Sequence, residues 1–240
     1  MSDITGNKEG FTLIELAIVI VAIAFIVATV TAGNGIIHQF KLRSLTADLY
    51  KYKTMISVFK TEYNALPGDM KNASSYWTGA INGNGDNLIN TFSESYLAWQ
   101  HLYNAGLIIK VPYNGTLAGS LPSSALSQKT SYFIFNLPSV AVSQLYLESG
   151  SKLAIHIVDS SLPTANWTFL TPRIKTTDAY YIDSKIDDGL ASRGKLVGWA
   201  PASGWFCALQ SNLGIAPTWY TGVAKYDLTR NGKCILTYYM

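Results

Sequence analysis

Glu15 raises the clearest chemical question in this sequence. It is the one charged residue in the stretch 11–32, which otherwise consists of apolar and uncharged residues. A lone charge in hydrocarbon costs several kcal/mol, roughly 2.5 to 3.5 on insertion scales, so a carboxylate there needs a function or a partner. The chemistry expected of Glu15 is therefore charge pairing inside an apolar segment.

A second group of oxygen-bearing side chains lies in the run 82–87, Asn-Gly-Asn-Gly-Asp-Asn. Their alternate spacing is that of calcium loops, in which positions 1, 3 and 5 supply ligands. Asn87 stands where glycine is expected, and the bidentate glutamate would fall one place before Glu94. Binding would be weak unless Asp69 or the pair 187–188 joins, and Asn-Gly runs are also ordinary turn formers. The candidate ligands are Asn82, Asn84, Asp86 and Glu94.

The element that carries Glu15 is long enough to cross a bilayer. Residues 11–32 number 22, which as a helix rise about 33 Å against a hydrocarbon thickness of about 30 Å. A secretory signal peptide is the main alternative, but it needs a basic leader and a small-residue cleavage site. Residues 1–10 hold one Lys against one Asp and one Glu, and residues 29–33 fit a small-x-small site only loosely.

Gly10 followed by residues 11–16, Phe-Thr-Leu-Ile-Glu-Leu, resembles the processing site of type IV prepilins and type II secretion pseudopilins. The resemblance implies cleavage by a prepilin peptidase between Gly10 and Phe11, N-methylation of Phe11 and retention of the apolar helix. It covers closely only about the first 30 residues, and the leader is less basic than is usual. The positive charges near the two ends of the helix do not determine in which direction it crosses the membrane. The cytoplasmic position of the leader is therefore only what the resemblance implies. Residues 63–69, 98–102, 105–108 and 182–189 also resemble pilin-like proteins of Gram-negative bacteria.

Cleavage would give Glu15 a partner. The freed amine of Phe11 is a cation four residues away, and in a bundle of such helices each carboxylate would meet the amine of a neighbouring subunit. Removing one member of a buried ion pair leaves the other charge unpaired, which costs roughly 3 to 5 kcal/mol. The pair would therefore set the axial register of neighbouring helices. The alternative is that Glu15 reaches the headgroups, one helical turn away.

The resemblance also bears on the two cysteines, Cys207 and Cys234. It implies that the head is exported from the cytoplasm to an oxidising compartment, and disulfides form in such compartments. We therefore expect the two residues to pair, which is worth roughly 3 to 4 kcal/mol in the chain-entropy description. Two free buried thiols are the alternative.

Composition and motifs argue against two other classes of protein. The net charge of +3 is small and scattered, whereas nucleic-acid binding calls for a concentrated basic face. No nucleophile-elbow or phosphate-binding glycine motif occurs, and the adjacent carboxylates of Asp187 and Asp188 diverge rather than converge on one atom. We expect no enzyme activity and no cofactor other than calcium.

Beyond Gly33 the sequence predicts an amphipathic helix half over residues 34–66. Its apolar positions recur at spacings of three and four between basic residues, and residues 66–69, Leu-Pro-Gly-Asp, end it. Gly33 and Gly35 predict a bend or a locally melted turn, because each lowers helix propensity by about 1 kcal/mol. The seam consists of Leu42, Leu45, Leu49, Tyr52, Ile56, Phe59 and Tyr63.

Residues 67–240 predict a globular head, preceded by a leader over residues 1–10 and a membrane and assembly half over residues 11–33. A helix capped by Thr91 or Ser93 should end at Gly106, and another should cover residues 177–188. Residues 115–131 predict a long surface loop. Strands are expected at residues 132–137, 153–158, 167–170, 196–199 and 234–239. The fold class is α+β: a long N-terminal helix packed on a mainly antiparallel β-sheet.

These features together favour a structural subunit of a type IV pilus or a type II secretion pseudopilus. The resemblance implies as partners other copies of the chain, other pilin-like subunits, the prepilin peptidase, the inner membrane and an assembly platform. It implies a precursor in the bacterial inner membrane with a periplasmic head, which becomes a surface pilus or a periplasmic pseudopilus. The alternatives are a minor pilin or adhesin, whose head binds a surface or ligand, and a membrane-anchored exported enzyme.

Overall fold

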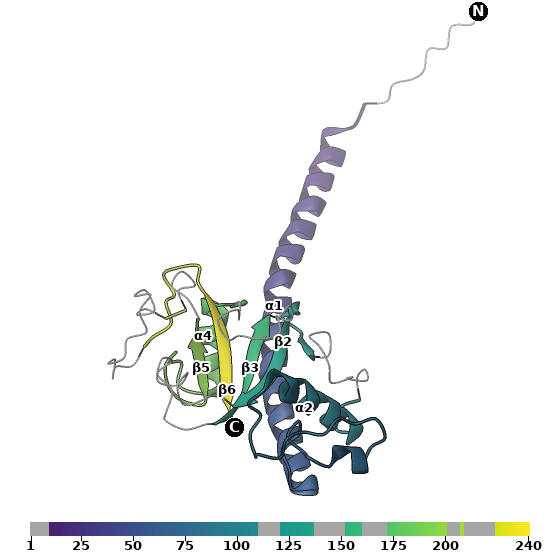
Figure 1. Cartoon of the computed structure of the whole chain (residues 1–240). Helices are drawn as coiled ribbons and strands as arrows, with labels where there is room; N and C mark the ends of the chain where they lie inside the picture. Colours follow the sequence, from purple (N-terminus) through teal and green to yellow (C-terminus); the bar gives the residue numbers. More distant parts are fainter. Residues whose placement is uncertain (1–9, 110–120, 137–151, 160–171, 201–206, 209–223) are drawn as a thin grey trace, which may run out of the picture. The chain divides into compact units, whose positions relative to one another are not determined.

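The computed structural model describes an α+β protein with a long N-terminal helix and an antiparallel sheet (Figure 1). The described residues are 10–109, 121–136, 152–159, 172–200, 207–208 and 224–240. The chain divides into two compact units, Met1–Lys41 and Leu42–Met240. The predicted fold class, with its antiparallel pairing, is confirmed at this level.

Helix α1 (Leu13–Tyr63) is helical over all of its 51 residues. Of the two alternatives predicted at Gly33 and Gly35, the melted turn is therefore wrong, since both residues are helical, and the bend stays a prediction. Nucleation is the costly step of helix formation, and extension through a weak residue costs only that residue's propensity. Two glycines inside a long helix do not interrupt it.

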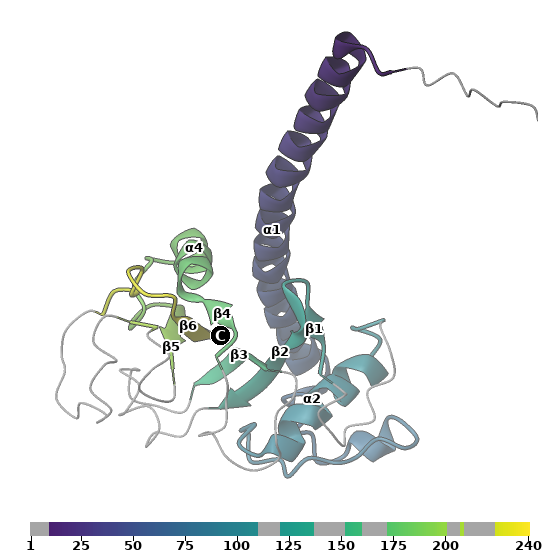
Figure 2. The ribbon, with the colours of Figure 1, turned by 90° about the horizontal axis from the view of Figure 1, so that it is seen from above.

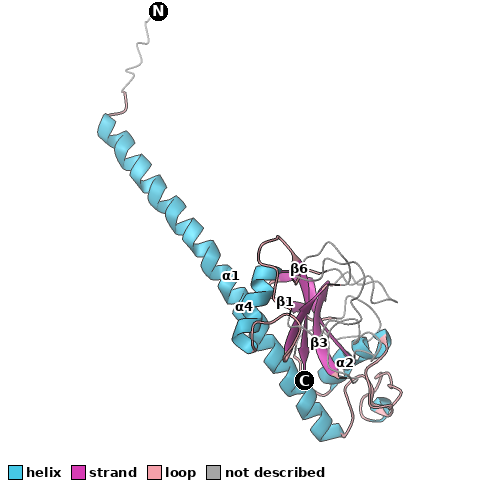
Figure 3. Ribbon diagram, turned by 90° about the vertical axis from the view of Figure 1, so that its left-hand side faces the viewer, coloured by secondary structure: helices cyan, strands magenta, loops and turns pink. Residues whose placement is uncertain are grey.

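Residues 42–63 of α1 belong to the second unit and form one side of its core. The predicted seam is confirmed: its six members from Leu42 to Phe59 are buried, and Tyr63 packs against the core. The ring of Tyr52 lies 4.9 Å from the rings of both Trp99 and Tyr132, and the Tyr132 hydroxyl donates to Asp48 at 3.0 Å. Residues 42–63 of α1 thus pack on the protein's own sheet (Figure 3).

The sheet of the second unit is antiparallel throughout the described residues. Its order is β1-β2-β3-β6-β4, and β5 also pairs with β6. Neighbouring residues of a strand point to opposite faces, and Tyr132 and Phe133 of β2 are both fully buried, so both faces of this strand are covered. The strands are β1 (Ser123–Ser124), β2 (Ser127–Asn136), β3 (Leu153–Asp159), β4 (Ile174–Lys175), β5 (Leu196–Trp199) and β6 (Lys233–Tyr239).

Two helices stand at opposite ends of this sheet: α2 (Phe92–Asn104) beside β2, and α4 (Thr176–Ile186) beside β4, β5 and β6 (Figure 2). A short 3₁₀ helix, η1, covers Ala73–Ser75. Helix α2 begins with a capping box, in which Thr91 accepts from the Glu94 N–H while Glu94 accepts from the Thr91 N–H. Of the two predicted caps, the structure therefore uses Thr91.

Four of the five predicted strands are present, β5 with the predicted bounds and β2, β3 and β6 with shifted ends. Strand β1 and the start of β2 at Ser127 both lie inside the loop predicted over residues 115–131, so that prediction is wrong from residue 123 onward. The small polar residues there suggested a loop, but Thr130 and Ser131 pair with Asp159 and Val158 of β3. The strand predicted at 167–170, and the first part of that loop, lie outside the described residues.

Candidate functional site

The predicted cleavage site precedes the first turn of α1. Gly10 is exposed, and a Cβ added there would meet no atom within 4 Å. The Phe11 side chain is 86% exposed. The described residues therefore leave the Gly10–Phe11 peptide bond accessible, while its cleavage stays a prediction.

Glu15 forms a capping box with Thr12 at this helix start. The Glu15 carboxylate accepts from the Thr12 N–H at 2.8 Å and from the Thr12 hydroxyl at 2.7 Å, and the Glu15 N–H donates to that hydroxyl at 3.3 Å. These bonds satisfy donors that a helix start otherwise leaves open. Sequence reasoning missed this role of Thr12, although the Thr-x-x-Glu spacing signals it.

Both bonds to the carboxylate engage one oxygen, Oε2. Oxygen Oε1 accepts none of the described hydrogen bonds of Glu15. A carboxylate has about four acceptor sites, so Glu15 can cap its own helix and still accept a charged donor from another molecule.

The surface that follows Glu15 is apolar on every side. One 18-residue stretch of α1 has a mean hydropathy of 2.9 and no buried residue. By length and composition alone α1 can cross a membrane, a test that an N-terminal signal sequence also passes. Its exposed large apolar residues include Leu13, Ile14, Leu16, Ile18, Val19, Ile20, Val21, Ile23, Phe25, Ile26, Val27 and Val30.

The predicted calcium loop is organised around Asp69, which is 2% exposed. Its carboxylate accepts from the backbone N–H groups of Gly85, Asp86 and Asn87 at 2.7 to 2.9 Å. Burial raises the pKa of Asp69, and the three N–H groups oppose that rise. Asp69 therefore closes the loop through the protein's own donors.

The predicted ligands of this loop come together only in part. Carboxylate oxygens of Asp69, Asp86 and Glu94 lie within 4.8 Å of one another. Asn82 instead accepts from the Ser74 N–H at 2.8 Å, and Asn84 bonds to Asp86 through its amide nitrogen at 3.3 Å. Glu94 also caps α2. This arrangement fits a hydrogen-bonded turn, and it would offer an ion three carboxylates.

The predicted disulfide between Cys207 and Cys234 is confirmed. Both residues are fully buried, and the bond joins positions 27 residues apart. The Asp227 N–H donates to the Cys207 carbonyl at 3.1 Å, which adds a backbone link inside the closed segment. The bond therefore fastens Cys207 to the central strand β6.

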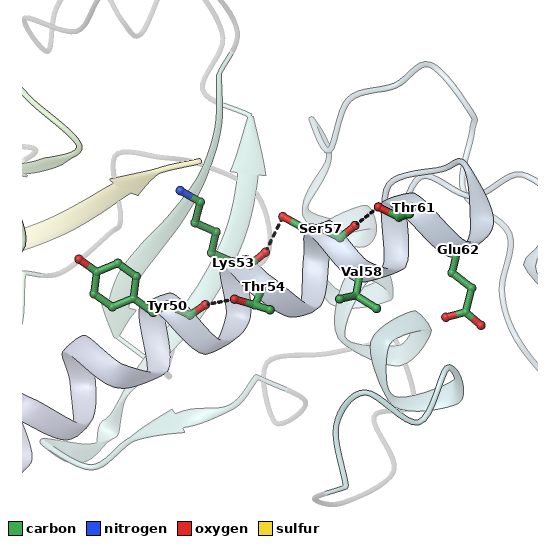
Figure 4. A pocket seen from close by; sticks show the side chains of 7 residues that line it. All are labelled: Tyr50, Lys53, Thr54, Ser57, Val58, Thr61 and Glu62. Atoms are coloured by element: carbon green, nitrogen blue, oxygen red, sulfur yellow. Dashed lines mark hydrogen bonds between the residues drawn. The ribbon is translucent and has the colours of Figure 1, made fainter.

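A groove of about 590 Å³ runs along the outer side of α1 in the second unit (Figure 4). Its serine and threonine hydroxyls bond to the helix itself, because Thr54, Ser57 and Thr61 each donate to the carbonyl four residues earlier at 2.9 to 3.0 Å. This outer face therefore combines apolar surface with the polar ends of Tyr50, Lys53 and Glu62. The lining residues are Tyr50, Lys53, Thr54, Ser57, Val58, Thr61 and Glu62.

Comparison of the chain with protein families, curated proteins and solved structures gives no match.

Proposed function

We propose that this chain is a structural subunit of a type IV pilus or a type II secretion pseudopilus, which polymerises through α1 after removal of residues 1–10 and N-methylation of Phe11. The observation that carries the proposal is the Gly10–Phe11 sequence and Glu15 at the start of a helix whose apolar surface is exposed. A helix that is apolar all round is stable in lipid or inside a bundle. The precursor would use the first environment and the filament the second.

In this proposal Glu15 has two tasks. It caps its own helix through Oε2, and its second oxygen accepts the Phe11 amine of a neighbouring subunit. A charge-assisted bond of this kind is roughly twice as strong as a neutral one. It also discriminates between registers, because sliding one helix along another would leave both charges unpaired in an apolar bundle.

The partners follow from this mechanism: copies of the chain and related subunits, the prepilin peptidase, the inner membrane and an assembly platform. The head would lie in the periplasm before assembly and on a surface pilus or periplasmic pseudopilus afterwards. The buried disulfide supports an oxidising compartment for the head. No catalytic role is part of the proposal.

Substitutions at the helix start separate the two tasks of Glu15. In Glu15→Gln the amide oxygen still accepts from Thr12, but the charge is lost, whereas in Thr12→Val the charge stays and the hydroxyl is lost. We expect Glu15→Gln, like Glu15→Val, to reduce incorporation into sheared filaments at least tenfold while the subunit stays in the membrane. Thr12→Val should assemble nearly as wild type. Normal assembly of Glu15→Gln would refute the ion pair.

One observation favours the alternative of a minor pilin or adhesin. Tyr76 is 56% exposed, and its ring lies 5.5 Å from that of Tyr63 and 5.7 Å from that of Trp77. Clustered aromatic rings at a surface suit sugars and protein partners. For an adhesin, Tyr76→Ala should reduce surface attachment and leave filament incorporation unchanged. If Tyr76→Ala changes neither, the result would favour a purely structural subunit.

A further inference from the structure

Three carboxylates gather where α4 ends. Oxygens of Asp183, Asp187 and Asp188 lie within 4.8 Å of one another. Asp183 is in the last turn of α4, and the other two follow Ile186, its last residue. The C-terminal end of a helix carries a partial negative charge, which disfavours further negative charge there. Like charges at this distance also oppose each other's ionisation.

The outer two carboxylates, Asp187 and Asp188, accept hydrogen bonds from neighbouring groups. Asp188 pairs with Arg193 at 2.9 Å and accepts from the Leu190 N–H at the same distance. Asp187 accepts from the backbone N–H groups of Lys195 and Leu196 at the start of β5. Both residues are also reached by solvent.

Asp183 differs from both because it is fully buried. It accepts from the Tyr226 hydroxyl at 2.8 Å and from the Gly189 N–H at 3.3 Å. Among the described residues, no lysine or arginine pairs with it. Burial, and secondarily the charges of Asp188 and Asp187, raise the pKa of Asp183 to about 7, while its two hydrogen bonds act in the opposite direction.

Tyr226 connects this carboxyl to the segment that the disulfide closes. Its backbone bridges to Ala208, beside Cys207, and the next residue, Asp227, donates to the Cys207 carbonyl. Its ring packs on Gly198 of β5, where an added Cβ would come within 2.4 Å of Cε1. The Asp183–Tyr226 contact is therefore the point at which α4, β5 and the disulfide-closed segment meet.

We propose that Asp183 is a proton-binding site that couples pH to the attachment of the segment 224–228 to α4. In the protonated state the carboxyl keeps its bonds to Tyr226 and Gly189 without a buried charge. In the ionised state the charge is buried, with Asp187 and Asp188 beside it. Opening the segment to water then becomes more favourable, although the ionised carboxylate is the stronger acceptor for Tyr226. The inference concerns the head alone and does not depend on filament assembly.

The direction of the pH effect follows from the two states of the chain. Unfolded, Asp183 releases its proton near its ordinary pKa of about 3.9; folded, it keeps the proton until a higher pH. The stabilisation is therefore complete below the unfolded pKa and is lost as pH rises toward about 7. The groups beside Asp183 are Tyr226, Asp187 and Asp188, with Arg193 acting through Asp188. Strand β5 packs on the Tyr226 ring through the uncharged Gly198.

The test is thermal unfolding of the full chain in detergent micelles at pH 5, 6, 7 and 8. The variant is Asp183→Asn, and Glu62→Gln is the matched control, which removes an exposed carboxylate outside this cluster. His101 and His156, whose pKa values burial lowers, act alike in every variant and cancel in the differences.

We expect the Tm of Asp183→Asn minus that of wild type to grow by about 3 to 5 °C per pH unit between pH 5 and 7, and then to level off. The difference for Glu62→Gln should stay constant. A difference for Asp183→Asn that does not change with pH would overturn the proposal.

Two measurements on the wild-type chain keep the test decisive if Asp183→Asn does not fold. With ¹³C-labelled aspartate, one carboxyl should titrate near pH 7, and titration of every aspartate below pH 5 would overturn the site. Hydrogen exchange of peptides covering residues 224–228, corrected for the intrinsic pH dependence of exchange, should show less protection at pH 8 than at pH 6. Equal protection at both values would overturn the coupling.

Discussion

The two stretches of α1 on either side of Lys41 are both helical, but most of the large apolar side chains are exposed in the first and buried in the second. In the first, Leu16 is 55% and Phe25 is 70% exposed, and in the second, Leu45 and Phe59 are fully buried. Helix formation alone therefore does not distinguish them. What differs is the partner, because the second stretch finds its partner in its own sheet, and the first finds none among the described residues.

The sequence pattern explains this difference. Apolar residues surround the helix axis in the first stretch, whereas in the second they form a seam at spacings of three and four between charged residues. A seam matches one packed surface. An all-round apolar helix requires an apolar environment on every side, which lipid or a helix bundle provides.

Truncation of one leucine in each stretch tests this comparison and should give its largest effect. Leu49→Ala removes a fully buried side chain and should reduce the free energy of unfolding by about 2 to 5 kcal/mol. Leu16→Ala should change it by less than about 0.5 kcal/mol. The measurement is denaturant unfolding of the full chain in detergent. Similar losses in the two variants would break the comparison.

Removal of the disulfide tests how much this bond contributes to the free energy of unfolding of the second unit. Replacing Cys207 and Cys234 together by alanine opens a link across 27 residues and should lower the free energy of unfolding by about 3 to 4 kcal/mol. Wild-type chain unfolded with and without a reducing agent provides the parallel experiment. A double variant as stable as wild type would show that the core alone holds this segment.

Calcium tests whether the second unit also relies on an external ion, and here we expect the smallest effect. The oxygens of Asp69 and Asp86 already accept N–H groups of the loop, so the Tm should change by less than about 1 °C between 10 mM calcium and excess chelator. A site with a dissociation constant of about 1 mM would instead stabilise by about 1.4 kcal/mol. A rise in Tm that chelator reverses and Asp86→Asn abolishes would establish the ion site.

Local features of the fold were predictable because their causes lie close together in the sequence. The seam from Leu42 to Phe59 follows from helical spacing, and the start of α2 follows from a Thr-x-x-Glu capping box. The same spacing at Thr12 and Glu15 also forms a capping box, although a glutamate in an apolar stretch points first to charge pairing. The melted turn at Gly33 failed because a local propensity does not decide the state of a long helix.

Contacts between distant residues were not predictable in the same way. Asp183 and Tyr226 are 43 positions apart, and nothing in the sequence around either signals the other. The start of β2 at Ser127 depends on pairing with β1 and β3, which polar side chains alone do not indicate. The order of the strands is likewise set by long-range packing.

The measurement that tests the central claim most directly is mass spectrometry of the mature chain from a Gram-negative host with a prepilin peptidase. We predict a polypeptide that begins at Phe11, carries one methyl group on its amine and retains residues 11–32. Gly10→Lys should remain unprocessed from Met1, and the control Gly6→Lys should be processed normally. A wild-type chain that begins elsewhere, or that lacks residues 11–32, would contradict the account.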